Sequence, residues 1–131
     1  MTSWLLMAVL PMMLTTSSTI ADMRWERRVL LITAPSDTDA ALIEQHHIID
    51  GWKAGAEARD LSLVEVVGDR VAGARDAAAT LRQQYRLPAK SFSAILIGKD
   101  GGEKLRGKRP FSAKLLEETI DAMPMRRSGQ R

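Results

Sequence analysis

Runs of apolar residues at strand-like spacing divide the chain. The most uniform is VLLITA, residues 29–34, which is typical of a central strand buried on both faces. Three further runs are bounded by turn-forming residues, and the last two flank the glycine-rich turn GKDGG. The predicted strands are Val29 to Ala34, Asp60 to Val67, Phe92 to Ile97 and Glu103 to Arg106.

Apolar residues at helical spacing predict three helices. The first has an apolar stripe from Leu42 to Ala56, and Ser36 followed by Asp39 resembles a capping box with Ser36 as the N-cap. Gly51 and Gly55 inside this helix indicate a bend or close packing. The predicted helices span Ser36 to Ala58, Ala74 to Tyr85 and Ser112 to Met123.

The order of elements is β-α-β-α-β-β-α, which predicts an α/β protein of thioredoxin-like architecture. We expect a mixed four-stranded sheet with helices on both faces. Alternating strands and helices favour parallel strands joined by right-handed crossovers, and the closing hairpin adds an antiparallel strand. Residues 68–73, GDRVAG, are expected to form a loop. The length of 131 residues is enough for one domain.

The first 21 residues, MTSWLLMAVLPMMLTTSSTIA, contain no charged residue and no histidine. The apolar stretch from Trp4 to Leu14 has the length of a signal-peptide core and is too short to span a bilayer. We therefore predict a signal peptide over residues 1–21, cleaved after Ala21, and a domain over residues 22–131 in the periplasm or outside the cell. The alternatives are an uncleaved anchor and an over-extended start.

The chain has no cysteine, two histidines and a net charge of +3. The missing cysteines exclude disulfides, thiol oxidoreductase and peroxidase chemistry, and cysteine-ligated zinc. The two histidines, His46 and His47, are adjacent and diverge on a helix, so we expect no metal site and no cofactor. His46 is expected to be partly buried and hydrogen-bonded.

Four stretches carry a family resemblance: RRVLLITAP, DLSLVEVVGD, FSAILIGKDGGEKLR and TIDAMPMRR. They resemble the peroxiredoxin-like domain of unknown function 4174, which is also similar to modules of sushi-repeat and coiled-coil-domain matrix proteins. The resemblance covers Trp25 to Arg127 and implies a thioredoxin-like fold. It implies no settled activity and no catalytic residue, because fold does not set function.

Thioredoxin-type and peroxiredoxin-type enzymes carry their reactive cysteine where a strand meets a helix. Here that junction holds Ser36, Asp37, Thr38 and Asp39. One interpretation is a helix cap with acids that complement the helix dipole. The alternative is an enzyme of unknown class that uses Asp37 or Asp39 with Ser36 or Thr38.

Basic residues gather in and after the predicted hairpin. If the C-terminal tail folds beside the hairpin, they form one positive patch that suits an acidic polymer or an acidic protein. An ordinary solvated surface is the alternative. The candidate binding residues are Lys99, Lys104, Arg106, Lys108, Arg109, Arg126 and Arg127.

The sequence thus favours an exported binding module on a thioredoxin-like fold. Its partner would be an unknown protein or acidic polymer, and nucleic acid is disfavoured because no aromatic residues interleave with the charges. Lys99 is expected to be exposed, and Trp25 and Trp52 are expected in or at the edge of the core. A structural envelope protein remains the third hypothesis.

Overall fold

The computed structural model describes residues 18–127 and 129. Within that part of the chain, one five-stranded sheet has the order β3-β2-β1-β4-β5. The strands are β1 (Arg28–Ala34), β2 (Leu61–Val67), β3 (Arg70–Ala72), β4 (Ser93–Ile97) and β5 (Glu103–Gly107). The helices are η1 (Ala21–Met23), α1 (Ala40–Gly51), α2 (Lys53–Ala58), α3 (Ala78–Tyr85), α4 (Ala113–Asp121) and α5 (Pro124–Arg127).

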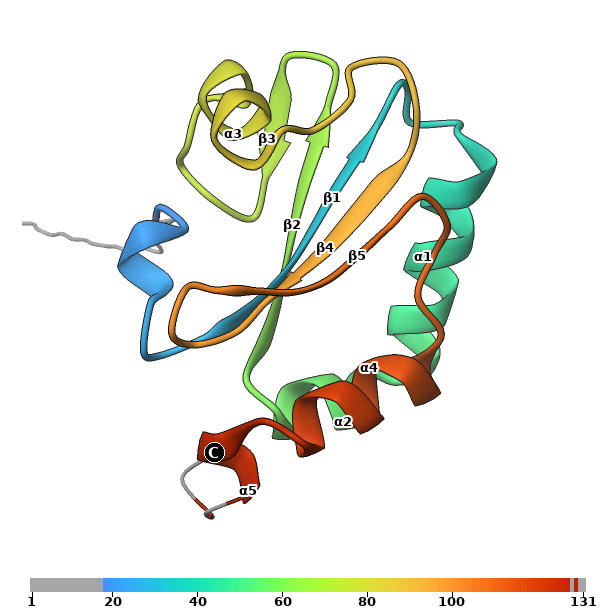
Figure 1. The fold of residues 1–131 in the computed structure, drawn as a ribbon. Coiled ribbons are helices and arrows are strands. Elements are labelled where there is room, and N and C mark those ends of the chain that lie inside the picture. Colours follow the sequence, from blue (N-terminus) through green and yellow to red (C-terminus); the bar gives the residue numbers. More distant parts are fainter. Residues whose placement is uncertain (1–17, 128, 130–131) are drawn as a thin grey trace, which may run out of the picture.

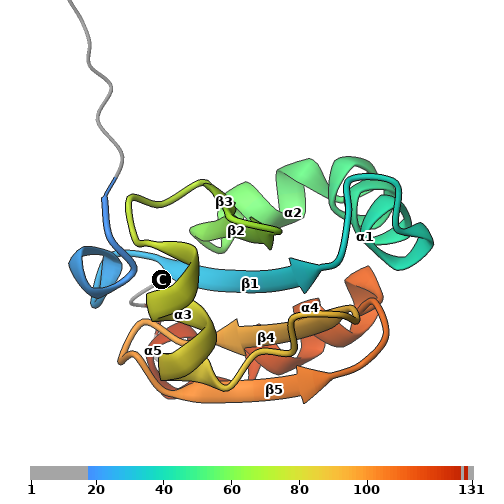
Figure 2. The ribbon, with the colours of Figure 1, turned by 90° about the horizontal axis from the view of Figure 1, so that it is seen from above.

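Strand β1 lies at the centre of the sheet, and all seven of its residues are buried. Side chains alternate between the two faces of a strand, so a strand covered on both sides must be apolar throughout. Leu30 and Ile32 pack with α1, α2 and α4 in one hydrophobic cluster. Val29 and Leu31 pack with η1 and α3 in a second cluster on the opposite face. Figure 1 and Figure 2 show the sheet between these two groups of helices.

The sheet is mixed, as predicted, but the directions of its strands differ from the expectation. β1 and β2 are parallel, whereas β4 runs antiparallel to β1. Before α3 begins, the chain has already turned back along β2, because β3 is antiparallel to β2 and a Cβ atom on Gly73 would lie 2.2 Å from the carbonyl oxygen of Leu63. After α3 the chain reaches the end of β1, where the hydroxyl of Thr33 donates to the carbonyl oxygen of Pro88, so β4 starts beside the end of β1. The hairpin of β4 and β5 is confirmed, with a bulge between Leu96 and Ile97.

The predicted loop at residues 68–73 contains the fifth strand. β3 pairs antiparallel with the end of β2 over three residues. Gly68 and Gly73 flank it with positive φ angles of 59° and 92°. A run of three residues between two glycines is too short for a period-two pattern, so the expectation of a loop was wrong.

The first long helix is interrupted, as its glycines indicate. Trp52, with φ −120° and ψ 24°, separates α1 from α2. A Cβ atom on Gly55 would lie 2.1 Å from the indole nitrogen of Trp52, so only glycine lets this ring pack against α2. Within residues 18–127, no helix combines the length and apolar character that crossing a membrane requires.

The chain before β1 belongs to the packed structure. Ile20 and Met23 are 6% and 8% exposed and lie in the cluster under α3. The backbone N–H of Ile20 donates to Asp76 Oδ1 at 2.9 Å. Of the predicted signal peptide, residues 18–21 thus take part in the fold, and residues 1–17 lie outside the described part of the chain.

Candidate functional site

The strand-to-helix junction after β1 holds a helix cap. Asp39 is the N-cap of α1, and its carboxylate accepts from the backbone N–H of Leu42 at 3.1 Å. The prediction of Ser36 as N-cap is wrong, because the helix begins three residues later than expected. The hydroxyl of Ser36 instead lies 3.2 Å from that of Thr38, in an exposed position.

Asp37 points away from the helix toward the edge of the sheet. Its Oδ1 accepts from Arg70 Nη2 at 2.6 Å, and both side chains are about two-thirds exposed. Asp39 is engaged by the helix backbone and Asp37 by an arginine of β3. The four candidate residues are therefore neighbours, but their two carboxylates serve a cap and a surface ion pair.

Lys99, expected on the surface, is 6% exposed. Its Nζ donates to Asp60 Oδ2 at 2.9 Å, and Arg27 Nη1 lies 3.8 Å from Asp60 Oδ1. A buried ammonium needs such a carboxylate, since desolvation disfavours an isolated charge. The ion pair ties the turn between β4 and β5 to the turn between α2 and β2. The exposed position predicted for Lys99 is wrong.

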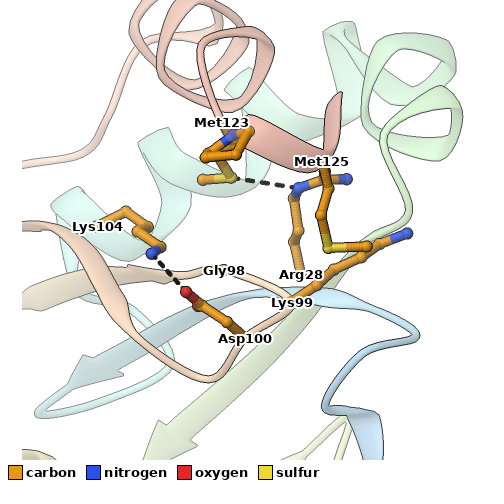
Figure 3. A pocket seen from close by; sticks show the side chains of 8 residues that line it. Arg28, Gly98, Lys99, Asp100, Lys104, Met123 and Met125 are labelled. Carbon is orange, nitrogen blue, oxygen red and sulfur yellow. Dashed lines mark hydrogen bonds and ion pairs between the residues drawn. The ribbon is translucent and has the colours of Figure 1, made fainter. Parts of the chain in front are cut away.

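A small pocket of about 80 Å³ lies beside this ion pair. Figure 3 shows Arg28 and Met125 at one side of the pocket, Met123 above, and Lys104 paired with Asp100 at the other side. Lys104 Nζ is 3.0 Å from Asp100 Oδ2. The backbone N–H of Gly102 and then Lys104 lower the pKa of Asp100. Lys104 is thus engaged within its own hairpin.

Arg28 begins β1 and is 1% exposed. Its Nε donates to the sulfur of Met123 at 3.3 Å, and its Nη1 donates to the carbonyl oxygen of Arg59 at 2.7 Å. Burial, followed by the nearby charge of Arg126, lowers the pKa of Arg28. These contacts join β1 to the end of α2 and to the C-terminal segment, which makes Arg28 part of the packing.

Arg126 also bonds within the protein. It donates to Asp121 Oδ1 at 3.4 Å and to the carbonyl oxygen of Ala58 at 3.2 Å. Asp121 receives two further bonds from Arg59, each of 3.0 Å. The Arg59 guanidinium lowers the pKa of Asp121. The side chain of Arg127, the last predicted binding residue, lies outside the described part of the chain.

Arg106 lies on the other side of the hairpin and connects β5 to the end of α3. Its Nη2 donates to the carbonyl oxygen of Tyr85 at 2.6 Å and to Glu103 Oε1 at 2.8 Å. Arg86, with φ 55°, ends α3 in the left-handed conformation. The last carbonyls of a helix favour a cation, so this contact fits the helix dipole. Arg106 also lowers the pKa of Glu103.

Three adjoining hollows run past this contact. The first, of about 190 Å³, lies between η1 and the end of α3 and shares Gln84 and Tyr85 with the second. The second, of about 570 Å³, shares Arg86 and Arg106 with the third, of about 550 Å³. Because each hollow shares two lining residues with the next, the three adjoin one another along the end of α3 and β5, and we describe them together as one groove.

This groove is strongly basic. Among the residues that the structure describes, one carboxylate, that of Glu103, lines it together with five cationic side chains. The cationic residues that line it are Arg24, Arg27, Arg86, Arg106 and Lys108. Within residues 18–127, no carboxylate lies within ion-pair distance of Arg24, Arg86 or Lys108. We call this surface the basic groove.

The structure therefore divides the predicted basic patch. It places Arg106 and Lys108 in the basic groove and Arg109 beside it in sequence. Lys99 and Lys104 line the pocket at Arg28, and Arg126 follows the lining residue Met125 in sequence. All three are engaged in ion pairs. Sequence reasoning missed Arg24, Arg27 and Arg86 as members of a basic surface. The polar segment MRWERR contains Arg24 and Arg27, and Arg86 directly precedes Leu87-Pro88, so both positions could have been considered.

The two tryptophans of the described chain differ from each other. Trp52 packs against the core as expected, and its indole N–H donates to Glu117 at 3.2 Å. Trp25 is 59% exposed, so its predicted core position is wrong. Its backbone N–H donates to the carbonyl oxygen of Lys99 at 2.6 Å, and the Arg24 guanidinium lies 5.5 Å from the ring centroid. The indole thus lies beside Arg24, which lines the basic groove.

His46 is partly buried and hydrogen-bonded, as predicted. Its Nε2 contacts Glu65 Oε2 of β2. The neighbouring Gln45 is fully buried, and its amide bonds both the N–H and the carbonyl of Phe111. Among the residues that the structure describes, no three His, Asp or Glu side chains come together in a group that could hold a metal ion.

A family model described as "Domain of unknown function (DUF4174)" matches residues 19–129. The chain belongs to this family. The DUF4174 chain is 25% identical over 126 aligned residues to coiled-coil domain-containing protein 80 of Danio rerio. The alignment covers 79% of this chain but only 14% of that relative, so the match concerns one module of a much longer protein.

Solved peroxiredoxins share the fold of the DUF4174 chain. The reduced 2-Cys peroxiredoxin of Plasmodium vivax aligns with TM-score 0.54 and 14% identity, over 83% of this chain and 72% of that one. Prx1a of Plasmodium yoelii, modified at its N-terminus, aligns with TM-score 0.60 and 16% identity, over 85% and 81% of the two chains. At such identities the likeness establishes a thioredoxin-like fold and no more.

Proposed function

We propose that this chain is an exported binding module without thiol chemistry, and that it binds an acidic polymer along the basic groove. The observation that carries the proposal is the lining of the groove by five cationic side chains and one carboxylate. The whole chain has a net charge of only +3, so the excess is concentrated on this surface.

The shape of the groove supports an extended ligand. Three linked hollows follow the end of α3 and β5, with cations in each of them. A concave surface of one charge sign focuses its field and raises the local concentration of an oppositely charged ligand. A polymer with regularly spaced negative charges can contact all three hollows at once, whereas a single small anion can contact only one.

The absence of cysteine supports the non-enzymatic part of the proposal. The fold is shared with peroxiredoxins, yet the junction after β1 holds a capping aspartate and a surface ion pair. The junction has a structural role, since it joins the buried strand β1 to the capped helix α1. Binding on the opposite helix layer, next to α3, needs none of the residues at that junction.

The test is a binding titration with two acidic polymers, polygalacturonate and poly-L-glutamate, at low ionic strength and at about 0.15 M salt, where the Debye length is about 8 Å. The melting temperature should rise with the polymers, because a ligand that prefers the native state stabilises it by mass action. The apparent affinity should fall with salt.

Charge reversal tests whether the basic groove is the surface that binds the polymer. The double variant Arg86→Glu and Lys108→Glu should bind at least about tenfold more weakly, since each change replaces an attraction of about 1 kcal/mol at contact in water by a repulsion. The control is Lys53→Glu with Lys114→Glu, which makes the same change in net charge on exposed positions of α2 and α4. Equal weakening in both variants, or no binding by the parent chain, would overturn the proposal.

Export rests on the uncharged N-terminal segment and its apolar stretch from Trp4 to Leu14. We expect the periplasmic or extracellular fraction of a producing bacterium to contain a chain from which the uncharged segment has been cleaved. A start at Asp22 would match the predicted site, whereas a start at or before Ser18 would keep the buried Ile20. Mass spectrometry of the intact protein measures this directly. A chain that keeps Met1 and stays in the cytoplasmic fraction would contradict export.

A further inference from the structure

Trp25 is the largest hydrophobic side chain exposed in the described part of the chain. Its φ angle is +72°, in the left-handed region that bulky residues rarely occupy. The backbone is fixed there by the bond to the carbonyl oxygen of Lys99, whose own side chain is buried in the ion pair with Asp60. The fold therefore keeps the indole of Trp25 exposed to solvent on a fixed backbone, and the left-handed conformation costs backbone strain.

The ring adjoins the first hollow of the basic groove. Arg24 lies over one face of Trp25 and also lines that hollow. Gly101, with φ 84°, makes room for this arrangement, because a Cβ atom there would come within 3.3 Å of Arg24 Nε. The exposed indole of Trp25 therefore lies next to the charged residues of the basic groove.

Neutral hydrogen-bonding groups separate the cations along the basic groove. Gln84 and Tyr85 line both the first and the second hollow, and the exposed Ser91 lines the third. The groove therefore offers amide, phenol and hydroxyl groups as well as guanidinium groups.

On the proposed function, we infer that the acidic polymer is a polysaccharide, and that Trp25 is the platform on which one of its sugar rings stacks. A pyranose ring has an apolar C–H face that packs on an indole face. Its hydroxyl groups match the neutral polar groups of the groove, and its carboxylate or sulfate groups match the arginines. Polyglutamate has the charges but no ring. Single-stranded nucleic acid favours several aromatic side chains interleaved with the charges, whereas this groove has one exposed ring beside it.

The experiment measures the affinity of the parent chain and of Trp25→Ala for three probes: polygalacturonate, poly-L-glutamate and oligo-deoxythymidine. Trp25→Ala should weaken polygalacturonate binding about tenfold and leave poly-L-glutamate binding unchanged. Trp25→Phe should restore most of the affinity. Ile43→Ala, a truncation of another exposed hydrophobic side chain on α1, should change neither. Tryptophan fluorescence should respond to polygalacturonate in the parent chain and not in Trp25→Phe.

The outcomes separate the two proposals. If no polymer binds, the proposed function is wrong. If the polymers bind and Trp25→Ala leaves polygalacturonate affinity unchanged, or weakens both acidic polymers equally, the basic groove stands and the polysaccharide inference is wrong. Tighter binding of oligo-deoxythymidine than of polygalacturonate would likewise overturn the inference.

Discussion

Gln45 offers a quantitative test of how the helical layer is joined to the hairpin. It is fully buried on α1, its Nε2 donates to the carbonyl oxygen of Phe111 at 3.0 Å, and its Oε1 accepts from the N–H of Phe111 at 2.8 Å. Phe111 lies between β5 and α4 and is 5% exposed. One side chain thus satisfies both polar groups of a buried residue that belongs to no helix or strand.

Gln45→Met keeps the size and shape of the side chain and removes both bonds. The N–H and the carbonyl of Phe111 would each be left without a partner, at a cost of about 1–3 kcal/mol per group. Part of this cost is offset, because a polar side chain no longer has to be buried at position 45. We expect a loss of about 2–4 kcal/mol in the free energy of unfolding. This is a large part of the stability of about 5–15 kcal/mol that is typical of a domain.

Urea unfolding followed by circular dichroism measures this loss. With a slope of about 1–2 kcal/mol per M, the midpoint should fall by about 1–4 M. Glu44→Met, on the exposed neighbour, is the matched control and should change stability by less than about 0.5 kcal/mol. Gln45→Glu should be most destabilising at neutral pH and less so in acid, since the protonated carboxyl can again donate to Phe111. A loss below about 0.5 kcal/mol for Gln45→Met would refute the reasoning.

Three further predictions concern stability. Removing residues 18–21 should cost about 2–4 kcal/mol, because it removes the buried Ile20 and its backbone bond, and urea unfolding of the two chain lengths measures this. In the same assay, Asp39→Ala should lower the free energy of unfolding by about 1 kcal/mol, and Ser36→Ala should leave it almost unchanged. A larger loss for Ser36→Ala than for Asp39→Ala would instead identify Ser36 as the cap. The pKa of Asp121 is lowered in the native state, so its contribution is present above the unfolded pKa of about 4 and is lost as pH falls. A melting series from pH 7 to about pH 3 should therefore show a smaller acid loss for Asp121→Asn, and identical curves would contradict the assignment.

The parts of the fold that sequence could predict have a strong local pattern. Strand β1 is an unbroken apolar run, and the predicted last helix begins at Ser112, whose hydroxyl caps α4 by accepting from the backbone N–H of Leu115 at 3.1 Å. The direction of β4 depends on the path of the chain from β3 through α3 to the end of β1, which no local pattern encodes. The extent of β3 depends on pairing with the end of β2 rather than on its own three residues.

The candidate site was harder to predict, because its residues meet from distant segments. The cations at positions 99–109 are close in sequence, and strict alternation along β5 would place Lys104 and Arg106 on one side of the hairpin. The bulge leaves Lys104 without a paired residue on β4, and the two side chains reach different sides. Lys99 finds its carboxylate 39 residues away, at Asp60. The basic groove joins Arg24 to Arg86 through the packing of η1 under α3, and a charge count along the chain does not show such a neighbourhood.

The placement of the basic groove has a consequence for how its charges can be exchanged. Both hydrophobic clusters share the central strand β1, so a disturbance there affects the two layers together. The cations that line the groove lie on the lead-in before β1, on the end of α3 and on the edge strand β5. Substitutions at the edge of a sheet and at the surface cost little stability. The charges of this surface can therefore be exchanged while the same interior is kept, and on the proposed function such an exchange would change the ligand.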